Sequence, residues 1–167
     1  TGLGEKALDR AGLPYKQIVT HAMHHAGYYP GATPMTIKLI FADCGDVLGA
    51  QIVGYDGVDK RIDTISTLLH FHGKVDDLTN LELAYAPPYS SAKDPVNFAG
   101  YAAENILVGF AHPIKFSEWE ADKDKYVLLD VREEIEVLAS PVDGAIHIPL
   151  TKLRDRFEEL DRDKCYV

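Results

Sequence analysis

The sequence contains little cysteine and no long apolar run. Its two cysteines, Cys44 and Cys165, are too few for a disulfide framework, which favours a reducing, cytoplasmic location. No apolar run approaches the roughly 18–20 residues that a helix needs to cross a bilayer. The first residues do not resemble a signal peptide. We therefore expect a cytoplasmic protein with no membrane-spanning segment.

Positive charge is also scarce. Seventeen lysines and arginines stand against 26 aspartates and glutamates, so the formal net charge is −9. This balance disfavours binding to nucleic-acid backbones or anionic membranes, although a local basic patch can still hold an anionic ligand. The apolar share of 46% is that of an ordinary globular protein, and 167 residues suffice for one domain plus part of another.

The first hundred residues alternate between helical and extended patterns. A short helix is expected to end at Gly12, and residues 16–25 follow as a strand. The apolar stretches 35–41 and 47–54 predict a β-hairpin, because both are rich in β-branched residues and a short polar turn separates them.

A clear helix follows the hairpin. One apolar stripe repeats at spacings of four and three residues and consists of Val58, Ile62, Ile65, Leu69 and His72. The polar positions between them, which include Lys60 and Arg61, are expected to face away from the core.

A second helix is expected to start at Asp94 and Pro95. An aspartate accepts backbone N–H bonds as an N-cap, and proline fits the first helical position. The small residues on one face of this helix would let another backbone come close. Burial against a sheet explains that face, and so does a subunit interface: Val96, Ala99, Gly100, Ala103 and Leu107.

The pattern changes at residues 109–117, where turn residues occur without a period, so we place a domain boundary there. Beyond it, residues 126–131 form an apolar stretch typical of a strand buried in a parallel sheet. A helix over 151–160 is expected to turn Leu153, Phe157 and Leu160 inward. The last residues begin another strand, which leaves the α/β pattern unfinished.

Several residue sets carry only weak chemical signals. The glycines of residues 2–7 match a dinucleotide fingerprint in letters, but no strand precedes them. On a strand, His21 and His25 share a face about 13 Å apart, and no cysteine or carboxylate completes a ligand set with the other histidines, so we predict no metal site. Cys44 lies between two aspartates, and Cys165 is expected to be buried in a strand, so neither is predicted to be a nucleophile.

Tyrosines are concentrated on loops that proline stiffens. Tyr28 and Tyr29 precede Pro30, while Tyr85 and Tyr89 flank a double proline. A phenol can donate a hydrogen bond to an anion, and a stiff loop orders it at little entropic cost. The same residues would also suit an interface or a core, and residue type alone leaves both interpretations open.

Three blocks resemble the C-terminal dimerisation domain of pyridine nucleotide–disulfide oxidoreductases: YYPGATPMTIKLIF, GAQIVGYDGVDKRIDTIS and LELAYAPPYSSAKDPVNFAGYAAEN. They are most similar to the coenzyme A-disulfide reductase and NADH-dependent persulfide reductase branch, over residues 1–105. After a linker at 106–115, YVLLDVREEIEV and GAIHIPLTKLR resemble the first half of a rhodanese domain at 116–167, with ASPVDGA in place of the usual Gly-His-Ile run. The implied fold class is α+β, an antiparallel sheet with helices, followed by part of an α/β domain.

The resemblance also implies roles for individual residues. In that branch, flavin and nicotinamide domains with one redox-active cysteine come first, and each subunit lends tyrosines to the active site of its partner. By motif position these would be Tyr28 and Tyr85, with Tyr89 nearby. Lys60 and Arg61 would contact coenzyme A. Ala86 and Pro87 replace the His-Pro motif of glutathione-reductase-like relatives, so histidine acid–base chemistry is not expected from this loop.

The resemblance therefore implies the dimer-forming fragment of a homodimeric oxidoreductase. The parent enzyme would use FAD and NAD(P)H to reduce coenzyme A disulfide, persulfide or polysulfide, and NADH oxidases share the scaffold. The fragment alone is expected to bind no cofactor and to be inactive, and Cys165 is not expected to carry sulfur because the catalytic loop of rhodaneses lies beyond Val167. Two alternatives stay open: a free-standing dimeric binding module, and a sulfurtransferase with an assembly domain.

Overall fold

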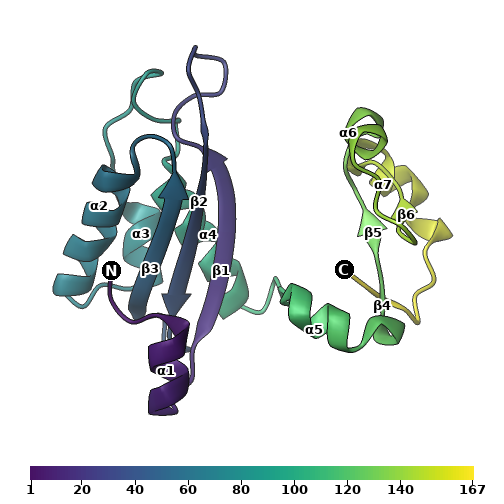
Figure 1. Cartoon of the computed structure of the whole chain (residues 1–167), viewed down its shortest axis with the longest axis horizontal. Coiled ribbons are helices and arrows are strands. Elements are labelled where there is room, and N and C mark those ends of the chain that lie inside the picture. The colour runs from purple at the N-terminus through teal and green to yellow at the C-terminus, as the bar shows by residue number, and fades with distance from the viewer. The chain divides into compact units, whose positions relative to one another are not determined.

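The computed structural model describes all 167 residues, and they form two compact units, residues 1–113 and residues 114–167 (Figure 1). The elements of the first unit are α1 (Glu5–Ala11), β1 (Lys16–Met23), β2 (Pro34–Phe41), β3 (Val47–Gly54), α2 (Val58–His70), α3 (Val75–Asn80) and α4 (Pro95–Leu107). Those of the second are α5 (Phe116–Ala121), η1 (Lys123–Lys125), β4 (Tyr126–Val127), β5 (Leu129–Asp130), α6 (Glu134–Ala139), β6 (Ile146–His147), α7 (Leu150–Arg156), η2 (Phe157–Glu159) and β7 (Cys165–Tyr166).

A three-stranded antiparallel sheet in the order β1-β2-β3 forms the centre of the first unit. The predicted hairpin is confirmed as β2 and β3, with Met35 opposite Gly54. Successive side chains of a strand point to opposite faces, so β2 buries one set against the helices: Met35, Ile37, Leu39 and Phe41. The sheet and its helices confirm the α+β fold class.

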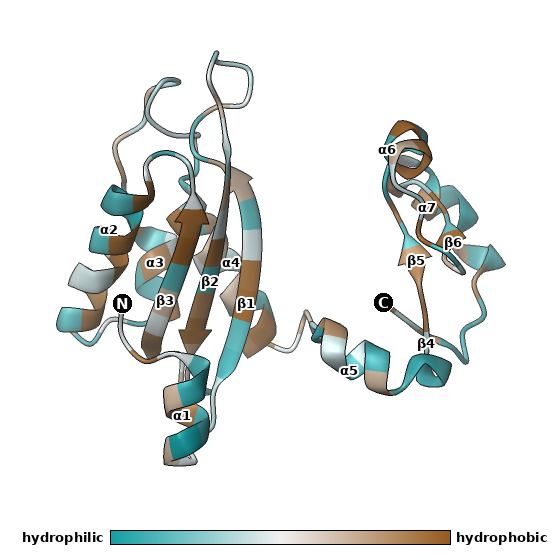
Figure 2. Ribbon diagram, in the orientation of Figure 1, coloured by the Kyte–Doolittle hydropathy of each residue, from teal (hydrophilic) through white to brown (hydrophobic).

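Helices cover one face of this sheet. α2 packs against β3, and α4 packs against β1 and β2 (Figure 1). The apolar stripe of α2 faces the sheet while its outer side is polar (Figure 2), and Ile65 is fully buried. His72, which the sequence placed in that stripe, is exposed and follows the end of the helix with a φ of 55°.

The small residues of α4 pack against α3, a short helix that was not predicted from the sequence. Six residues are too few to show a helical period, although α3 buries Val75 and Leu78. A Cβ atom at Gly100 would lie 2.9 Å from the Leu78 Cβ and 3.1 Å from the Thr79 backbone nitrogen. The closest approach, at Gly100, is therefore made to a helix of the same unit, which was not predicted, while α4 also packs against β1 and β2 of the sheet.

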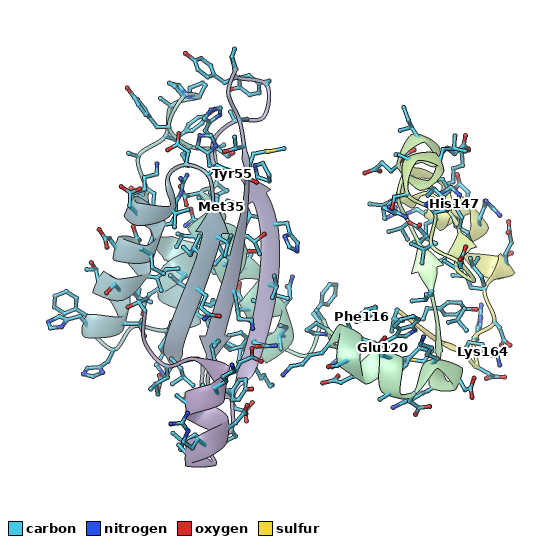
Figure 3. All side chains as sticks on the ribbon, in the orientation of Figure 1. Met35, Tyr55, Phe116, Glu120, His147 and Lys164 are labelled. Atoms are coloured by element: carbon cyan, nitrogen blue, oxygen red, sulfur yellow. The ribbon has the colours of Figure 1, made fainter.

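The second unit contains short parallel strand pairs. β4 pairs with β7, and β5 pairs with β6. The prediction of one continuous strand at 126–131 is therefore wrong, because two short strands separated by Leu128 occupy this stretch. Two burial predictions are also wrong: Cys165 is exposed, and Phe157 is 52% exposed. Ile148 is the one large apolar side chain of this unit that is fully buried. His147, labelled in Figure 3, precedes it at the end of β6.

None of the helices combines the length and the apolar character that crossing a membrane requires.

The packing of β2 predicts a sharp contrast between two strand positions. Leu39→Ala removes a fully buried side chain from the core, so it should lower the free energy of unfolding of the first unit by about 2–5 kcal/mol. Val53→Ala, at a position 74% exposed, should change it by less than about 0.5 kcal/mol. Urea denaturation followed by circular dichroism measures both, and equal losses would contradict the assigned register.

Candidate functional site

Two loops come together at one end of the sheet. One joins β1 to β2, and the other leads from α3 into α4; both extend beyond the same end of the strands (Figure 1). The Ala26 backbone N–H donates to the Ser90 carbonyl at 3.2 Å, which ties the two loops together. Within the second loop, the N–H groups of Tyr89 and Ser90 both donate to the Ala86 carbonyl and close a turn around the double proline.

The tied loops bring Tyr28 and Tyr85 into contact. Their hydroxyl oxygens lie 3.3 Å apart although the residues are 57 positions apart in sequence. Both side chains stay open to solvent, at 77% exposed for Tyr28 and 50% for Tyr85. The two tyrosines that the sequence singled out by motif position therefore form one exposed phenol pair.

The hydrogen bond within the pair raises the pKa of Tyr28, and desolvation adds to the effect. Either hydroxyl can be the donor in this bond, and the hydroxyl that accepts keeps its own hydrogen for another acceptor. Such a pair can offer a hydrogen bond to an anion that approaches from solvent.

Tyr89 contributes to the site through its backbone. Its ring is exposed, and its carbonyl accepts a 2.7 Å hydrogen bond from the Lys60 ammonium group. The phenol of Tyr89 is not part of the Tyr28–Tyr85 hydrogen bond.

Arg61 lies beneath the two loops, and the prediction that it faces away from the core is wrong. Its side chain is 1% exposed and forms an ion pair at 2.9 Å with Asp94, which is 4% exposed. The guanidinium also donates to the carbonyls of Gly57 at 3.0 Å and His24 at 2.5 Å. A buried arginine requires such partners, because an unpaired charge in the interior is strongly unfavourable.

Asp94 combines two structural tasks. As predicted, it is the N-cap of α4 and accepts from the Val96 N–H at 3.0 Å. It also accepts a 2.7 Å hydrogen bond from Ser90. Burial acts to raise the pKa of Asp94, but the hydrogen bonds from Arg61, Val96 and Ser90 outweigh it and hold that pKa below its usual value.

A small cavity of about 200 Å³ adjoins this network. Its lining consists of Lys60, Arg61, Thr64, Leu83, Ala84 and Asp94. Partial burial lowers the pKa of Lys60, and the charge of Arg61 adds to the effect. Lys60 is the exposed basic group here, whereas the donors of Arg61 are directed at protein acceptors.

The histidines have structural roles in this region. β1 ends at Met23, so the prediction that His25 shares a strand with His21 is wrong. His24 and His25 are buried with ring centroids 4.1 Å apart, and the His24 Nδ1 accepts from the Thr33 N–H at 3.0 Å. No three side chains of the metal-binding types gather closely enough in the structure to hold a metal ion.

Comparisons with known proteins point to one family. The family model of the pyridine nucleotide-disulphide oxidoreductase dimerisation domain matches residues 1–95. The coenzyme A disulfide reductase of Staphylococcus epidermidis is 41% identical over 103 residues, which are 61% of this chain and 24% of that protein. The enzyme of the same name from Staphylococcus aureus (strain bovine RF122) is 40% identical over 103 residues. The chain thus spans 24% of the length of these curated relatives.

Solved structures are similar over a longer range. The reduced CoADR-RHD of Bacillus anthracis is 50% identical with a TM-score of 0.94, over 99% of this chain and 30% of that one. The NAD-dependent persulfide reductase of A. fulgidus is 40% identical with a TM-score of 0.88, over the same shares of the two chains. The water-forming NADH oxidase of Lactobacillus brevis, at 20% identity and a TM-score of 0.62 over 66% of this chain and 25% of that one, shares the fold.

The phenol pair predicts a shift in the titration of Tyr28. Tyr85→Phe removes the hydroxyl that is hydrogen-bonded to Tyr28, so the pKa of Tyr28 should fall toward the ordinary tyrosine value of about 10. Tyr55→Phe is the matched control, because Tyr55 is exposed near the end of β3 (Figure 3). NMR titration with ¹³C-labelled tyrosine measures the pKa, and an unchanged value in Tyr85→Phe would contradict the pairing.

The buried ion pair predicts a loss of stability that depends on pH. Asp94→Asn keeps an N-cap but leaves Arg61 without its counter-charge, so the free energy of unfolding should fall by about 3–5 kcal/mol at pH 7. Because the pKa of Asp94 is lowered by folding, its contribution is complete above the unfolded value of about 3.9 and is lost as the pH falls through the folded value. When the pH is lowered from 7 through the folded value, Asp94→Asn should therefore lose less stability than the wild type.

Asp46→Asn provides the control for this prediction. Its ion pair with Lys74 lies at the surface, where such pairs contribute little. Urea denaturation between pH 2.5 and pH 7 compares the variants. Similar behaviour of Asp46→Asn and Asp94→Asn would contradict the special role of the buried pair.

Proposed function

The chain belongs to the pyridine nucleotide-disulphide oxidoreductase dimerisation-domain family, and from this membership we propose that it is the dimer-forming part of a larger reductase. The proposed parent enzyme is a cytoplasmic homodimer that reduces coenzyme A disulfide, a persulfide or a polysulfide. The names of the relatives, coenzyme A disulfide reductase and NAD-dependent persulfide reductase, support this choice of substrates.

The exposed Tyr28–Tyr85 pair is the observation that carries the proposal. Two phenols held 3.3 Å apart on tied loops are suited to bind a negative charge, yet the first unit offers them no reacting sulfur. Its one cysteine, Cys44, lies in the β2–β3 turn, at the opposite end of the strands from the tyrosine loops. We propose that the sulfur is supplied by the partner subunit, so that each subunit completes the active site of the other.

The phenols act where charge develops. When an S–S bond breaks, the departing sulfur gains negative charge, and a hydrogen bond from a phenol stabilises that thiolate. In the proposed site Tyr85 donates to the sulfur while Tyr28 donates to Tyr85 and orients it. Lys60, the exposed basic group beside the tyrosine loop, is proposed to contact the phosphates of coenzyme A. Arg61, proposed by motif position as a second contact, has its donors engaged within the protein.

We propose that residues 2–7 do not bind a dinucleotide, although their letters match the fingerprint. The glycines at residues 2–4 lead into α1, but Gly2 pairs with Gly49 of β3, and the first turn of α1 carries Glu5, which forms an ion pair with Lys38. A carboxylate at this position disfavours a pyrophosphate. In our proposal FAD and NAD(P)H, which supply the electrons, are therefore bound by other domains of the parent enzyme.

We also propose that the second unit is part of a rhodanese domain, preceded by a dimerisation domain at 1–105 and a linker at 106–115. Three observations support this division. The boundary between the two compact units, at Pro113 and Ile114, falls within the proposed linker. The strand pairs of the second unit are parallel, and the likeness to CoADR-RHD extends over 99% of the chain. By itself the 167-residue chain is expected to show neither reductase nor sulfurtransferase activity.

The proposed role of the phenols predicts a change in turnover without a change in assembly. In the parent protein, Tyr85→Phe should lower kcat for the NADH-dependent reduction of coenzyme A disulfide by about 10²–10³-fold, the usual effect of removing one such donor. Tyr55→Phe, which removes an exposed hydroxyl outside the pair, should leave kcat unchanged. Steady-state kinetics and analytical ultracentrifugation test both points, and full turnover in a dimeric Tyr85→Phe variant would contradict the proposal.

A further inference from the structure

Arg61 connects the three segments from which the tyrosine end of the first unit is built. From α2 it donates to Asp94 at the start of α4, to His24 at the end of β1 and to Gly57 at its own helix start. Gly57 has a φ of 63°, and a Cβ atom there would collide with the Arg61 Nη1. The guanidinium therefore occupies a closed space that fits this side chain.

Short connections lead from these partners to both phenols. His24 lies two residues before Ala26, whose N–H donates to the Ser90 carbonyl, and Tyr28 follows two residues later. Asp94 accepts from the Ser90 hydroxyl, and the Ser90 N–H in turn donates to the Ala86 carbonyl, next to Tyr85. Every step is a hydrogen bond or a few residues of backbone.

From these contacts we propose that Arg61 is a positioning residue, which sets the geometry of the Tyr28–Tyr85 pair through its buried ion pair with Asp94. This assigns Arg61 to the support of the site and not to contact with a ligand. The inference rests on the proposed function only where it predicts an effect on turnover, because the geometry of the phenol pair can be measured without it.

The shape of the guanidinium explains why arginine stands here. Its planar fork places several N–H donors in fixed directions, and here it reaches Asp94 at 3.2, 3.1 and 2.9 Å while still reaching the carbonyls of two loops. A lysine would keep the charge but has one compact ammonium group on a flexible stem, which cannot span the same acceptors. Arg61→Lys is therefore the variant that separates geometry from charge.

The kinetic test uses the full-length parent protein with coenzyme A disulfide and NADH. Arg61→Lys should lower kcat by about 10–100-fold, as expected when reacting groups are misplaced by about 1 Å, with little change in KM. Ser90→Ala removes one hydrogen bond from the same network and keeps the charges, so it should lower kcat in the same direction but less. Ile65→Ala creates a cavity in the core beside the same helix. It should leave kcat unchanged at a temperature at which the variant stays folded.

A double-mutant comparison identifies the route of the effect. If Arg61 acts through Tyr85, then Arg61→Lys in a Tyr85→Phe background should cause no further loss of kcat. If Tyr85→Phe lowers kcat, the inference is overturned when the two losses multiply, when Arg61→Lys and Ser90→Ala leave kcat unchanged, or when Ile65→Ala reduces kcat equally.

A second readout does not depend on catalysis. In the 167-residue chain labelled with ¹³C-tyrosine, Arg61→Lys should move the pKa of Tyr28 toward its ordinary value because the phenol pair opens, whereas Ile65→Ala should not. If Tyr85→Phe retains full turnover, the proposed function fails while this titration still decides the positioning role. An unchanged Tyr28 pKa in Arg61→Lys would overturn the positioning role even if the proposed function holds.

Discussion

A buried ion pair between Arg61 and Asp94 is the constraint on which the tyrosine end of this unit depends. Both side chains are almost fully removed from water. Removing charges from water is costly, and here each lost water contact is replaced by a protein partner: Ser90 and the Val96 N–H on the carboxylate, and backbone carbonyls on the guanidinium. The start of α4, the end of β1 and the start of α2 meet at these partners, so their positions are fixed together.

The same arrangement explains how two exposed phenols can be well ordered. The Tyr28–Tyr85 hydrogen bond is formed in solvent, where a single bond contributes little on its own. Its geometry comes from the loops beneath it, which are tied to each other and to the ion pair. In water such donors interact weakly with an anion, and their effect grows when a partner surface excludes the solvent. An open but preordered pair is thus suited to a site that a second subunit completes.

Local signals in the sequence predicted much of this structure. The antiparallel hairpin, the stripe of α2 and the Asp94 N-cap follow from strand composition, helical period and capping, each of which involves neighbouring residues. Family resemblance selected Tyr28 and Tyr85, and the structure brings their hydroxyls together. The hairpin, the stripe and the N-cap needed no knowledge of distant contacts, whereas the tyrosine pair came from the resemblance alone.

The burial of Arg61 could not be predicted in the same way. Its partner lies 33 residues away, and a charged residue between the apolar positions of a helix normally faces water. The small α4 residues could not show whether they face the sheet or another subunit, and their contact with α3 was not predicted because α3 is too short for a period. In the second unit, strands of two residues are too short to show an alternating pattern, so the division of 126–131 into two strands could not be predicted.

Subunit complementation tests the central claim, that the tyrosines act on the sulfur of the partner subunit. One subunit of the parent protein would carry Tyr28→Phe and Tyr85→Phe, and the other would lack the redox-active cysteine of the proposed preceding domains. If each site takes its cysteine from one subunit and its phenols from the other, the mixed dimer has one complete site and should recover about half of the wild-type turnover. If the phenols act within their own subunit, neither site is complete, and a mixed dimer without activity would contradict the account.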